Sequence, residues 1–153
     1  MCSSDLELLE RVRATCDVAE VDLKVGLDTF RPVAVADLDA HAMHSEAYGV
    51  EPAVRARIAA ARRVVAIGTT TTRVLETIAD PAAPDAGRTS LLIQPGHRFR
   101  SVGMLVTNFH LPRSTLLALV MAFGGESLIR DAYAQAVQRG YRFYSFGDAM
   151  AIL

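Results

Sequence analysis

The spacing of apolar residues predicts alternating helices and strands along most of the chain. Leucines and a valine recur at helical spacing from Leu6 to about residue 15, behind Ser4 or Asp5 as a capping residue. Apolar and polar residues then alternate over residues 17–25, as they do in a strand that is covered on one face. The first part of the chain is therefore expected to form a helix, a strand and, over residues 26–32, a loop.

The rest of the chain continues this pattern. We expect Val64 to Ile67 to form a strand in the interior of a sheet, because this run is apolar on both faces, and a helix to follow Gly68. Further helices are expected over 51–61, 114–123 and 126–139, and further strands over 91–93, 104–107 and 141–146. Strands mixed with helices predict an α/β fold: a mixed sheet flanked by helices, similar to a three-layer sandwich.

Composition places the chain among globular proteins of one domain. Of its 153 residues, 51% are apolar and 22% charged, which excludes disordered, collagen-like and low-complexity proteins. Cys2 and Cys16 are too few for a disulfide framework and favour a reducing, cytoplasmic setting. The longest apolar stretch, Leu116–Phe123, is far shorter than the ~20 residues that span a bilayer, so we expect no insertion into a membrane.

Charge is distributed unevenly along the chain. Residues 1–51 carry eleven acidic and four basic side chains, a net charge of −7, whereas residues 52–153 carry six acidic and twelve basic ones, a net charge of +6. No Asp or Glu lies between Asp85 and Glu126, although four arginines and two histidines do. This predicts a cationic surface for phosphate or carboxylate groups. The alternative is that the arginines are scattered over different faces.

The first segment with candidate chemistry is the strand-to-helix turn at residues 68–76. A glycine is followed by four threonines, so uncapped N–H groups and hydroxyls gather where an anion or a ribose can bind. Thr69, Thr70 and Arg73 are the candidate ligands. The segment lacks the glycine spacing and the Lys-Ser/Thr pair of a P-loop. Alternatively, the threonines only cap the helix, and Arg73 pairs with Glu76 on the same helical face.

Two histidines and a carboxylate lie close together at residues 41–46. We expect no metal site here, because a transition-metal ion needs three or four protein ligands and the chain has no further Cys/His cluster. His44 and Glu46 fit general acid–base chemistry better, since an imidazole titrates near neutral pH. The alternative is that both are solvated loop residues.

A third segment, residues 107–115, combines an amide, an imidazole, a guanidinium and three hydroxyls between a strand end and a helix start. Its candidate functional residues are Asn108, His110, Arg113, Ser114 and Thr115. Helix capping explains only the last two of them. No Gly-x-Ser-x-Gly motif accompanies them, which disfavours a hydrolase. Because this segment and the threonine-rich turn both follow strands, we expect Thr69, Thr70 and Arg73 to line the same cleft as Asn108, His110 and Arg113.

Taken together, these motifs resemble those of one family. In chain order they are Val25 to Val33 (Val-Gly-Leu-Asp-Thr-Phe-Arg-Pro-Val), Met43 to Glu46, Gly68 to Thr70 with Arg73 and Leu75-Glu76, Pro95-Gly96, Thr107 to Leu116, and Tyr141 to Ala149. This set closely resembles the S-adenosylmethionine:tRNA ribosyltransferase-isomerases of queuosine biosynthesis. The resemblance extends from about residue 6 to the C-terminus, and Asn-Phe-His-Leu-Pro at 108–112 is its most diagnostic part.

The resemblance covers the C-terminal part of the larger domain of that family. Family members are longer; by resemblance, a β-barrel-like second domain and the first strands of the α/β domain are absent from this chain. We therefore expect residues 6–153 to form an incomplete α/β domain, and residues 1–5, which do not resemble the family, to be a non-native start. Two residues depart from the family pattern: Asp28 replaces a glycine and Ser90 replaces an aspartate.

The resemblance implies that the ribosyl group of S-adenosylmethionine is transferred to 7-aminomethyl-7-deazaguanine in the anticodon stem-loop of tRNA and isomerised to epoxyqueuosine. S-adenosylmethionine is then a co-substrate, no metal or other cofactor is needed, and the protein is expected to be a monomer. The sulfonium acidifies a ribose C–H, so a base must remove that proton. We rank His44 with Glu46 first for this role and His110 second. The substrate-binding candidates are Thr69, Thr70, Arg73, Asn108, Arg113, Ser114 and Thr115.

Two other functions stay open. A methyltransferase-like protein would use the same ligand, but the chain lacks the glycine-rich fingerprint that such proteins carry near the N-terminus. A catalytically inactive fragment that binds tRNA or S-adenosylmethionine is the second alternative. We expect the 153-residue chain alone to form no epoxyqueuosine.

Overall fold

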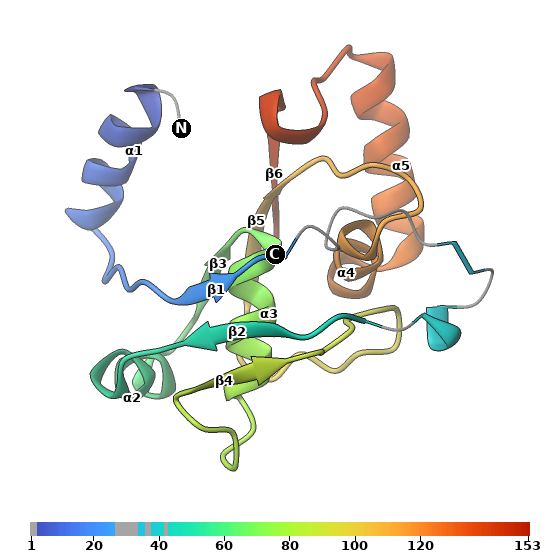
Figure 1. Ribbon diagram of the computed structural model, residues 1–153. Coiled ribbons are helices and arrows are strands. Elements are labelled where there is room, and N and C mark those ends of the chain that lie inside the picture. The colour runs from blue at the N-terminus through green and yellow to red at the C-terminus, as the bar shows by residue number, and fades with distance from the viewer. Residues whose placement is uncertain (1–2, 27–33, 36–37, 42) are drawn as a thin grey trace.

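Figure 1 shows the computed structural model of the chain, in which residues 3–26, 34–35, 38–41 and 43–153 are described. These residues form two three-stranded sheets with helices packed beside them. Parallel and antiparallel pairs both occur, which confirms the predicted α/β class. The predicted loop at residues 26–32, with the departure at Asp28, lies outside the described residues except for Gly26.

The helices confirm the sequence pattern more closely than the strands do. The helices of the described residues are α1 (Ser3–Arg13), α2 (Pro52–Ala60), α3 (Thr69–Ile78), α4 (Thr115–Gly124) and α5 (Glu126–Gln138). The strands are β1 (Asp22–Lys24), β2 (Glu46–Gly49), β3 (Val65–Ile67), β4 (Ala86–Thr89), β5 (Met104–Asn108) and β6 (Ala149–Ile152). Two short 3-10 helices are η2 (Leu38–Ala40) and η3 (Tyr144–Phe146). The strand predicted over 17–25 is thus only three residues long.

The first sheet is antiparallel, in the order β1-β2-β4. In its central strand, Glu46 pairs with Thr89 of β4 and Gly49 with Asp22 of β1. Successive side chains of a strand point to opposite faces, and Glu46 and Tyr48 both lie on the buried one. The sheet register therefore places a carboxylate inside the protein.

The second sheet has the order β3-β5-β6, with β3 parallel and β6 antiparallel to the central strand. Ile67 of β3 lies opposite Val106 of β5. Because the two strands are parallel, their carboxyl ends meet at one edge of the sheet and their amino ends at the other. The threonine-rich turn and residues 108–110 follow the carboxyl ends, so they begin at the same edge.

Helix α3 contacts both sheets: β1 of the first, and β3 and β5 of the second (Figure 1). Seven of its ten residues are buried, and Val74, Leu75 and Ile78 belong to the hydrophobic core. A helix that is buried on most of its surface has no solvent face for its charged side chains. The charges of Arg73 and Glu76, both buried, must therefore be met by other parts of the protein.

The prediction that Val64 to Ile67 lies in the interior of a sheet is wrong. In the described part of the chain β3 pairs only with β5, and it is an edge strand. Val65 is 44% exposed and Ile67 67%, whereas Ala66 between them is fully buried. An apolar run indicates a strand, but it carries no information on how many neighbours that strand has.

The strands predicted at 91–93 and 141–146 are also wrong. Residues 91–93 are irregular, and the strand of that region is β4, which begins five residues earlier. Residues 141–143 are irregular and residues 144–146 form η3, and the rings of Tyr141 and Phe143 pack on Phe109 at centroid distances of 5.8 and 5.3 Å. Aromatic residues favour strands only because they pack well on a pleated surface, and here they pack on another ring instead.

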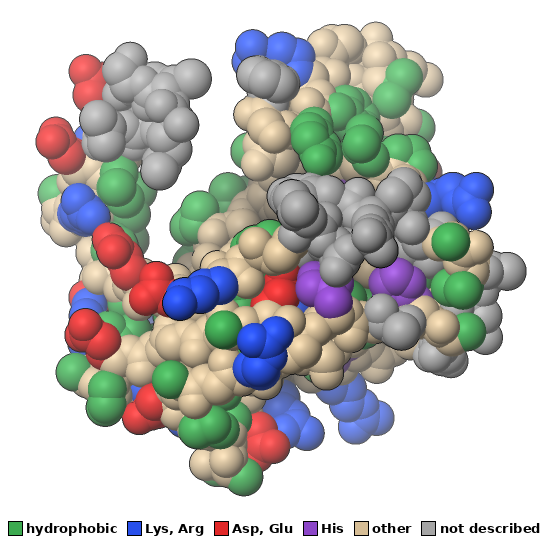
Figure 2. All heavy atoms as spheres, viewed as in Figure 1, with side chains coloured by type: hydrophobic (Ala, Val, Ile, Leu, Met, Phe, Trp, Pro, Cys, Tyr) green, Lys and Arg blue, Asp and Glu red, His purple; other side chains and the backbone are tan. Residues whose placement is uncertain are grey.

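The charge asymmetry of the sequence is visible on the molecular surface. Acidic side chains gather over α1 and the segment that leads to β1 (Figure 2). Among the residues that the structure describes, no helix has the length and apolar character needed to cross a membrane.

The turn between α4 and α5 generates a prediction. A Cβ at Gly124 would lie 2.6 Å from Ile129 Cδ1 and 3.2 Å from Ile152 Cγ2, whereas a Cβ at Gly49 would meet nothing within 4 Å. We expect Gly124→Ala to lower the free energy of unfolding by about 1–3 kcal/mol, because the core must shift to make room. Urea denaturation of the 153-residue chain measures this, with Gly49→Ala as the matched control. Equal effects of the two substitutions would contradict the packing described at Gly124.

Candidate functional site

Glu46 and Arg73 form a buried ion pair between the first sheet and α3. Arg73 Nη1 donates to Glu46 Oε2, and the exposed fractions of the two side chains are 4% and 1%. The alternative interpretation, in which Arg73 pairs with Glu76, is wrong, because Arg73 pairs with Glu46 and Glu76 accepts from the backbone of a different loop. A buried carboxylate and a buried guanidinium each need an opposite charge, and β2 and α3 bring these two together.

Two nitrogen atoms of Arg73 have no hydrogen-bond partner among the residues that the structure describes. They are Nε and Nη2, and both are closed off from solvent. These atoms share one edge of the planar guanidinium, the edge that can hold a carboxylate through two parallel hydrogen bonds. Buried donors without acceptors are costly and therefore uncommon in native proteins, so this edge suits an anionic ligand.

His44 lies beside the same carboxylate. Its Nε2 is 3.1 Å from Glu46 Oε1, and the backbone N–H of Gly26 donates to that oxygen at 2.8 Å. The side chain of His44 is 21% exposed, so it is the one member of this group that reaches the surface. Glu46 fixes the orientation of the imidazole, as a carboxylate does for a catalytic histidine. The described residues contain no group of three or more potential metal ligands.

The four threonines of the threonine-rich turn form two pairs that differ in the hydrogen bonds of their hydroxyls. Thr71 and Thr72 donate to the carbonyl oxygens of Ile67 and Gly68, at 2.8 and 3.1 Å, so their hydroxyls serve the backbone. The hydroxyls of Thr69 and Thr70 make no hydrogen bond within the described residues. Gly68 precedes them with a φ of 90°, a conformation that favours glycine, and no side chain caps the helix. Thr69 and Thr70 are therefore the two free for a ligand, and their role stays a prediction.

His110 lies just beyond the end of β5 and is partly buried. Burial lowers the pKa of His110 to about 4, and its Nε2 lies 2.8 Å from the hydroxyl of Thr107. Its backbone N–H donates to the hydroxyl of Tyr133 at 2.8 Å. Burial also raises the pKa of Tyr133. An imidazole of this pKa takes up a proton poorly at neutral pH, so the geometry favours a hydrogen-bonding role over that of a base.

The other candidates of the third segment differ in their surroundings. Ser114 caps α4, because its Oγ accepts from the N–H of Leu117 at 3.1 Å, and Thr115 is buried in the first turn. Asn108 is exposed and makes one long contact, at 3.4 Å, to the carbonyl of Asp148. Arg113 is exposed with a φ of 57°, a left-handed backbone that costs energy in a residue other than glycine.

The two strand-to-helix segments meet only in part. Thr69 and Thr70 follow the carboxyl end of β3, Asn108 is the last residue of its parallel neighbour β5, and the N–H of Gly68 donates to the carbonyl oxygen of Val106 at 2.8 Å. Arg73 lies one turn further along α3 and joins His44 and Glu46 instead. The single cleft predicted for all six residues stays a prediction, while the parallel register supports a common edge for its strand ends.

Glu76 has a role that the sequence motifs did not indicate. Its carboxylate accepts from the backbone N–H groups of Arg100, Ser101 and Val102, at 2.9, 3.0 and 3.0 Å, and lies 3.3 Å from His97 Nε2. Glu76 thereby holds the loop that leads into β5. The signal for it in the sequence is a carboxylate inside an apolar helical pattern, between Leu75 and Ile78.

Comparison with known proteins gives consistent results. The profile of a family described as "Queuosine biosynthesis protein" matches residues 4–152. A curated relative from Sorangium cellulosum, named S-adenosylmethionine:tRNA ribosyltransferase-isomerase, is 56% identical over 95% of this chain and 41% of its own length. One of the same name from Symbiobacterium thermophilum is 53% identical over 96% of this chain and 46% of its own length.

A solved structure agrees with these relatives. The S-adenosylmethionine tRNA ribosyltransferase of Thermotoga maritima is 44% identical, with a TM-score of 0.78, over 96% of this chain and 49% of that one. The chain thus spans less than half the length of the relatives it matches.

The low pKa of His110 predicts a dependence of stability on pH. Between the unfolded pKa of about 6.5 and the folded pKa of about 4, the unfolded chain binds a proton that the folded chain does not. The contribution of neutral His110 is therefore complete above about pH 6.5 and is lost as the pH falls toward about 4. We expect the free energy of unfolding of His110→Gln to fall by roughly 2–3 kcal/mol less than that of the unaltered chain over this pH range, as measured by urea denaturation. His41→Gln is the control, and an unchanged pH dependence in His110→Gln would disprove the assignment.

Proposed function

Because the chain belongs to the queuosine biosynthesis protein family, we propose that it takes part in transferring and isomerising the ribosyl group of S-adenosylmethionine onto a base of tRNA. The acceptor is 7-aminomethyl-7-deazaguanine in the anticodon stem-loop, and the product is epoxyqueuosine. S-adenosylmethionine is consumed as a co-substrate, and adenine and methionine leave. The names of the curated relatives support both substrates.

The observation that carries this proposal is the unsatisfied edge of Arg73. S-adenosylmethionine carries the α-carboxylate of methionine, which matches the paired N–H groups of Nε and Nη2. Glu46 occupies Nη1 and so fixes the direction in which this edge points. Both nitrogens are closed off from solvent, so neighbouring side chains move when the carboxylate binds. Thr69 and Thr70, one turn earlier on α3, are assigned to the ribose hydroxyls.

The proton-transfer step is assigned to His44. Its Nε2 lies 3.1 Å from Glu46 Oε1, and the imidazole is assigned to accept the ribose proton next to the sulfonium. Glu46 acts as a positioning residue, because Arg73 and the N–H of Gly26 already occupy its oxygens. His110, with its pKa lowered to about 4, holds a substrate group by a hydrogen bond instead. Asn108, Arg113, Ser114 and Thr115 are the further binding candidates on the tRNA side.

An alternative is an inactive protein that only binds S-adenosylmethionine or tRNA. Activity is best measured in a hybrid protein in which residues 4–152 replace the matching segment of the Sorangium cellulosum relative. The hybrid is expected to convert substrate tRNA to epoxyqueuosine, detected by mass spectrometry of its nucleosides. A well-folded hybrid without product would favour the alternative.

Arg73→Lys tests the assigned ligand of the guanidinium. Lysine keeps the positive charge that Glu46 requires but lacks the paired N–H edge. We expect the affinity of the hybrid for S-adenosylmethionine to fall about 10- to 100-fold, the loss of a charged hydrogen bond, with little change in melting temperature. Isothermal titration calorimetry measures the affinity, and Arg57→Lys, at an exposed ion pair with Asp17, is the matched control. Equal affinities of the two variants would refute the assignment.

His44→Ala tests the assigned base. We expect it to slow the single-turnover rate at saturating S-adenosylmethionine by about 10²–10⁴-fold while affinity stays near normal, because a general base acts on the chemical step. His110→Ala is expected to weaken binding more than it slows the step. If His110→Ala abolished the step and His44→Ala did not, the two roles would have to be exchanged.

A further inference from the structure

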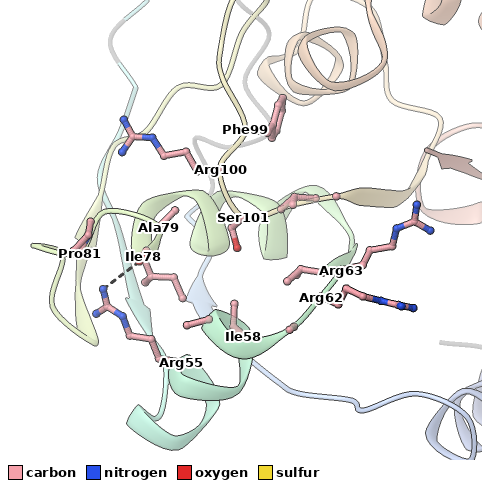
Figure 3. A pocket seen from close by; sticks show the side chains of 15 residues that line it. Arg55, Ile58, Arg62, Arg63, Ile78, Ala79, Pro81, Phe99, Arg100 and Ser101 are labelled. Carbon is pink, nitrogen blue, oxygen red and sulfur yellow. Dashed lines mark hydrogen bonds between the residues drawn. The ribbon is translucent and has the colours of Figure 1, made fainter.

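A cavity lies at the edge of the second sheet opposite to the one where Thr69 and Thr70 lie. Its volume is about 800 Å³, and α2, the end of α3 and the segments that precede β3 and β5 form its walls (Figure 3). Its lining includes none of the residues that the sequence motifs single out as functional. Ile58, Ile78 and Phe99 contribute apolar side chains to the lining. This surface therefore has no part in the chemistry assigned to Arg73 and His44.

The rim of this cavity is positively charged. Four arginines contribute to its lining, and no Asp or Glu does. Arg55 is engaged, since it donates to Asp85 at 2.9 Å and to three backbone carbonyls. Arg62, Arg63 and Arg100 are exposed, and their side chains form no ion pair or hydrogen bond within the described residues. Three positive charges thus stand around the pocket without a counter-charge.

The three arginines stand on a fixed backbone. Arg62 and Arg63 lead directly into β3, where Val64 accepts from the N–H groups of Gly103 and Met104 at 2.9 and 3.2 Å. Arg100 belongs to the loop whose N–H groups Glu76 holds, so a buried carboxylate determines its position. Because the backbone beneath the three exposed side chains is fixed, binding has to order the side chains only, which costs less entropy than ordering a free loop as well.

We propose that this arginine-rimmed pocket binds the sugar-phosphate backbone of RNA. Figure 3 shows Arg62 and Arg63 on one side of the pocket and Arg100 on the other, so the guanidinium groups do not converge on one small anion. Such spacing suits a polyanion with a phosphate at each side, and the apolar side chains of the lining can contact a ribose or a base. The choice of RNA among polyanions rests on the proposed function, whereas the surface itself is independent of the candidate site.

The proposal is tested with the 153-residue chain and an unmodified, fluorescently labelled tRNA transcript, by anisotropy over a series of salt concentrations. The variant Arg62→Ala/Arg63→Ala/Arg100→Ala should weaken binding roughly tenfold or more. It should also reduce the slope of log affinity against log salt by about 2–3, since each phosphate contact contributes about 0.7–0.9. The control, Arg130→Ala/Arg139→Ala/Arg142→Ala, removes the same charge from exposed positions of α5 and beyond and should change neither quantity.

Several outcomes would overturn the proposal. The first is that the unaltered chain does not bind tRNA, and the second is that the two triple variants lose the same amount of tRNA affinity. The third is that polyglutamate binds as tightly as the tRNA and loses affinity in the variant that lacks Arg62, Arg63 and Arg100. The last result would identify the surface as a docking site for an acidic protein. Affinity of the hybrid protein for S-adenosylmethionine should not change in the first variant. A failure of the Arg73 assignment therefore leaves this proposal standing, and the reverse also holds.

Discussion

Burial of α3 between two sheets is the constraint on which the rest of the structure depends. The helix carries one positive and one negative side chain in an otherwise apolar environment, and burying either charge without a partner costs several kcal/mol. Arg73 is satisfied by Glu46 of the first sheet, and Glu76 by the backbone N–H groups that lead into the second. Each buried charge of α3 thus has its partner in a different part of the protein, Arg73 in the first sheet and Glu76 in the loop that leads into the second.

These two attachments also position the two surfaces for which functions are proposed. On the side of the first sheet, Glu46 contacts both Arg73 and His44, the residues proposed to bind the ligand carboxylate and to accept the proton. On the side of the second sheet, Glu76 holds the loop that carries Arg100 at the rim of the arginine-rimmed pocket. One helix can therefore connect a small-molecule site to an RNA-binding surface without a residue common to both.

The sequence predicts the helices well, because amphipathic spacing, Pro52 in a first turn and glycines after α4 and α5 are local signals. It predicts strands less well: Val65 and Ile67 are exposed at an edge, and Tyr141 to Phe146 forms no strand. Edge or interior position and aromatic packing depend on distant neighbours that periodicity does not record.

The same limit applies to the site. His44, Glu46 and Arg73 were recognisable as chemical groups, but the pairing of Arg73 with Glu46, 27 positions away, and the burial that lowers the pKa of His110 follow only from the tertiary structure.

The central claim is that a buried ion pair presents the free edge of Arg73 to the carboxylate of S-adenosylmethionine. A crystal structure of the hybrid protein with bound S-adenosylmethionine tests this most directly. The account predicts the methionine carboxylate within about 3 Å of both Nε and Nη2, with Glu46 still on Nη1. A bound ligand whose carboxylate lies elsewhere, with the Nε and Nη2 edge closed by a protein group, would contradict it.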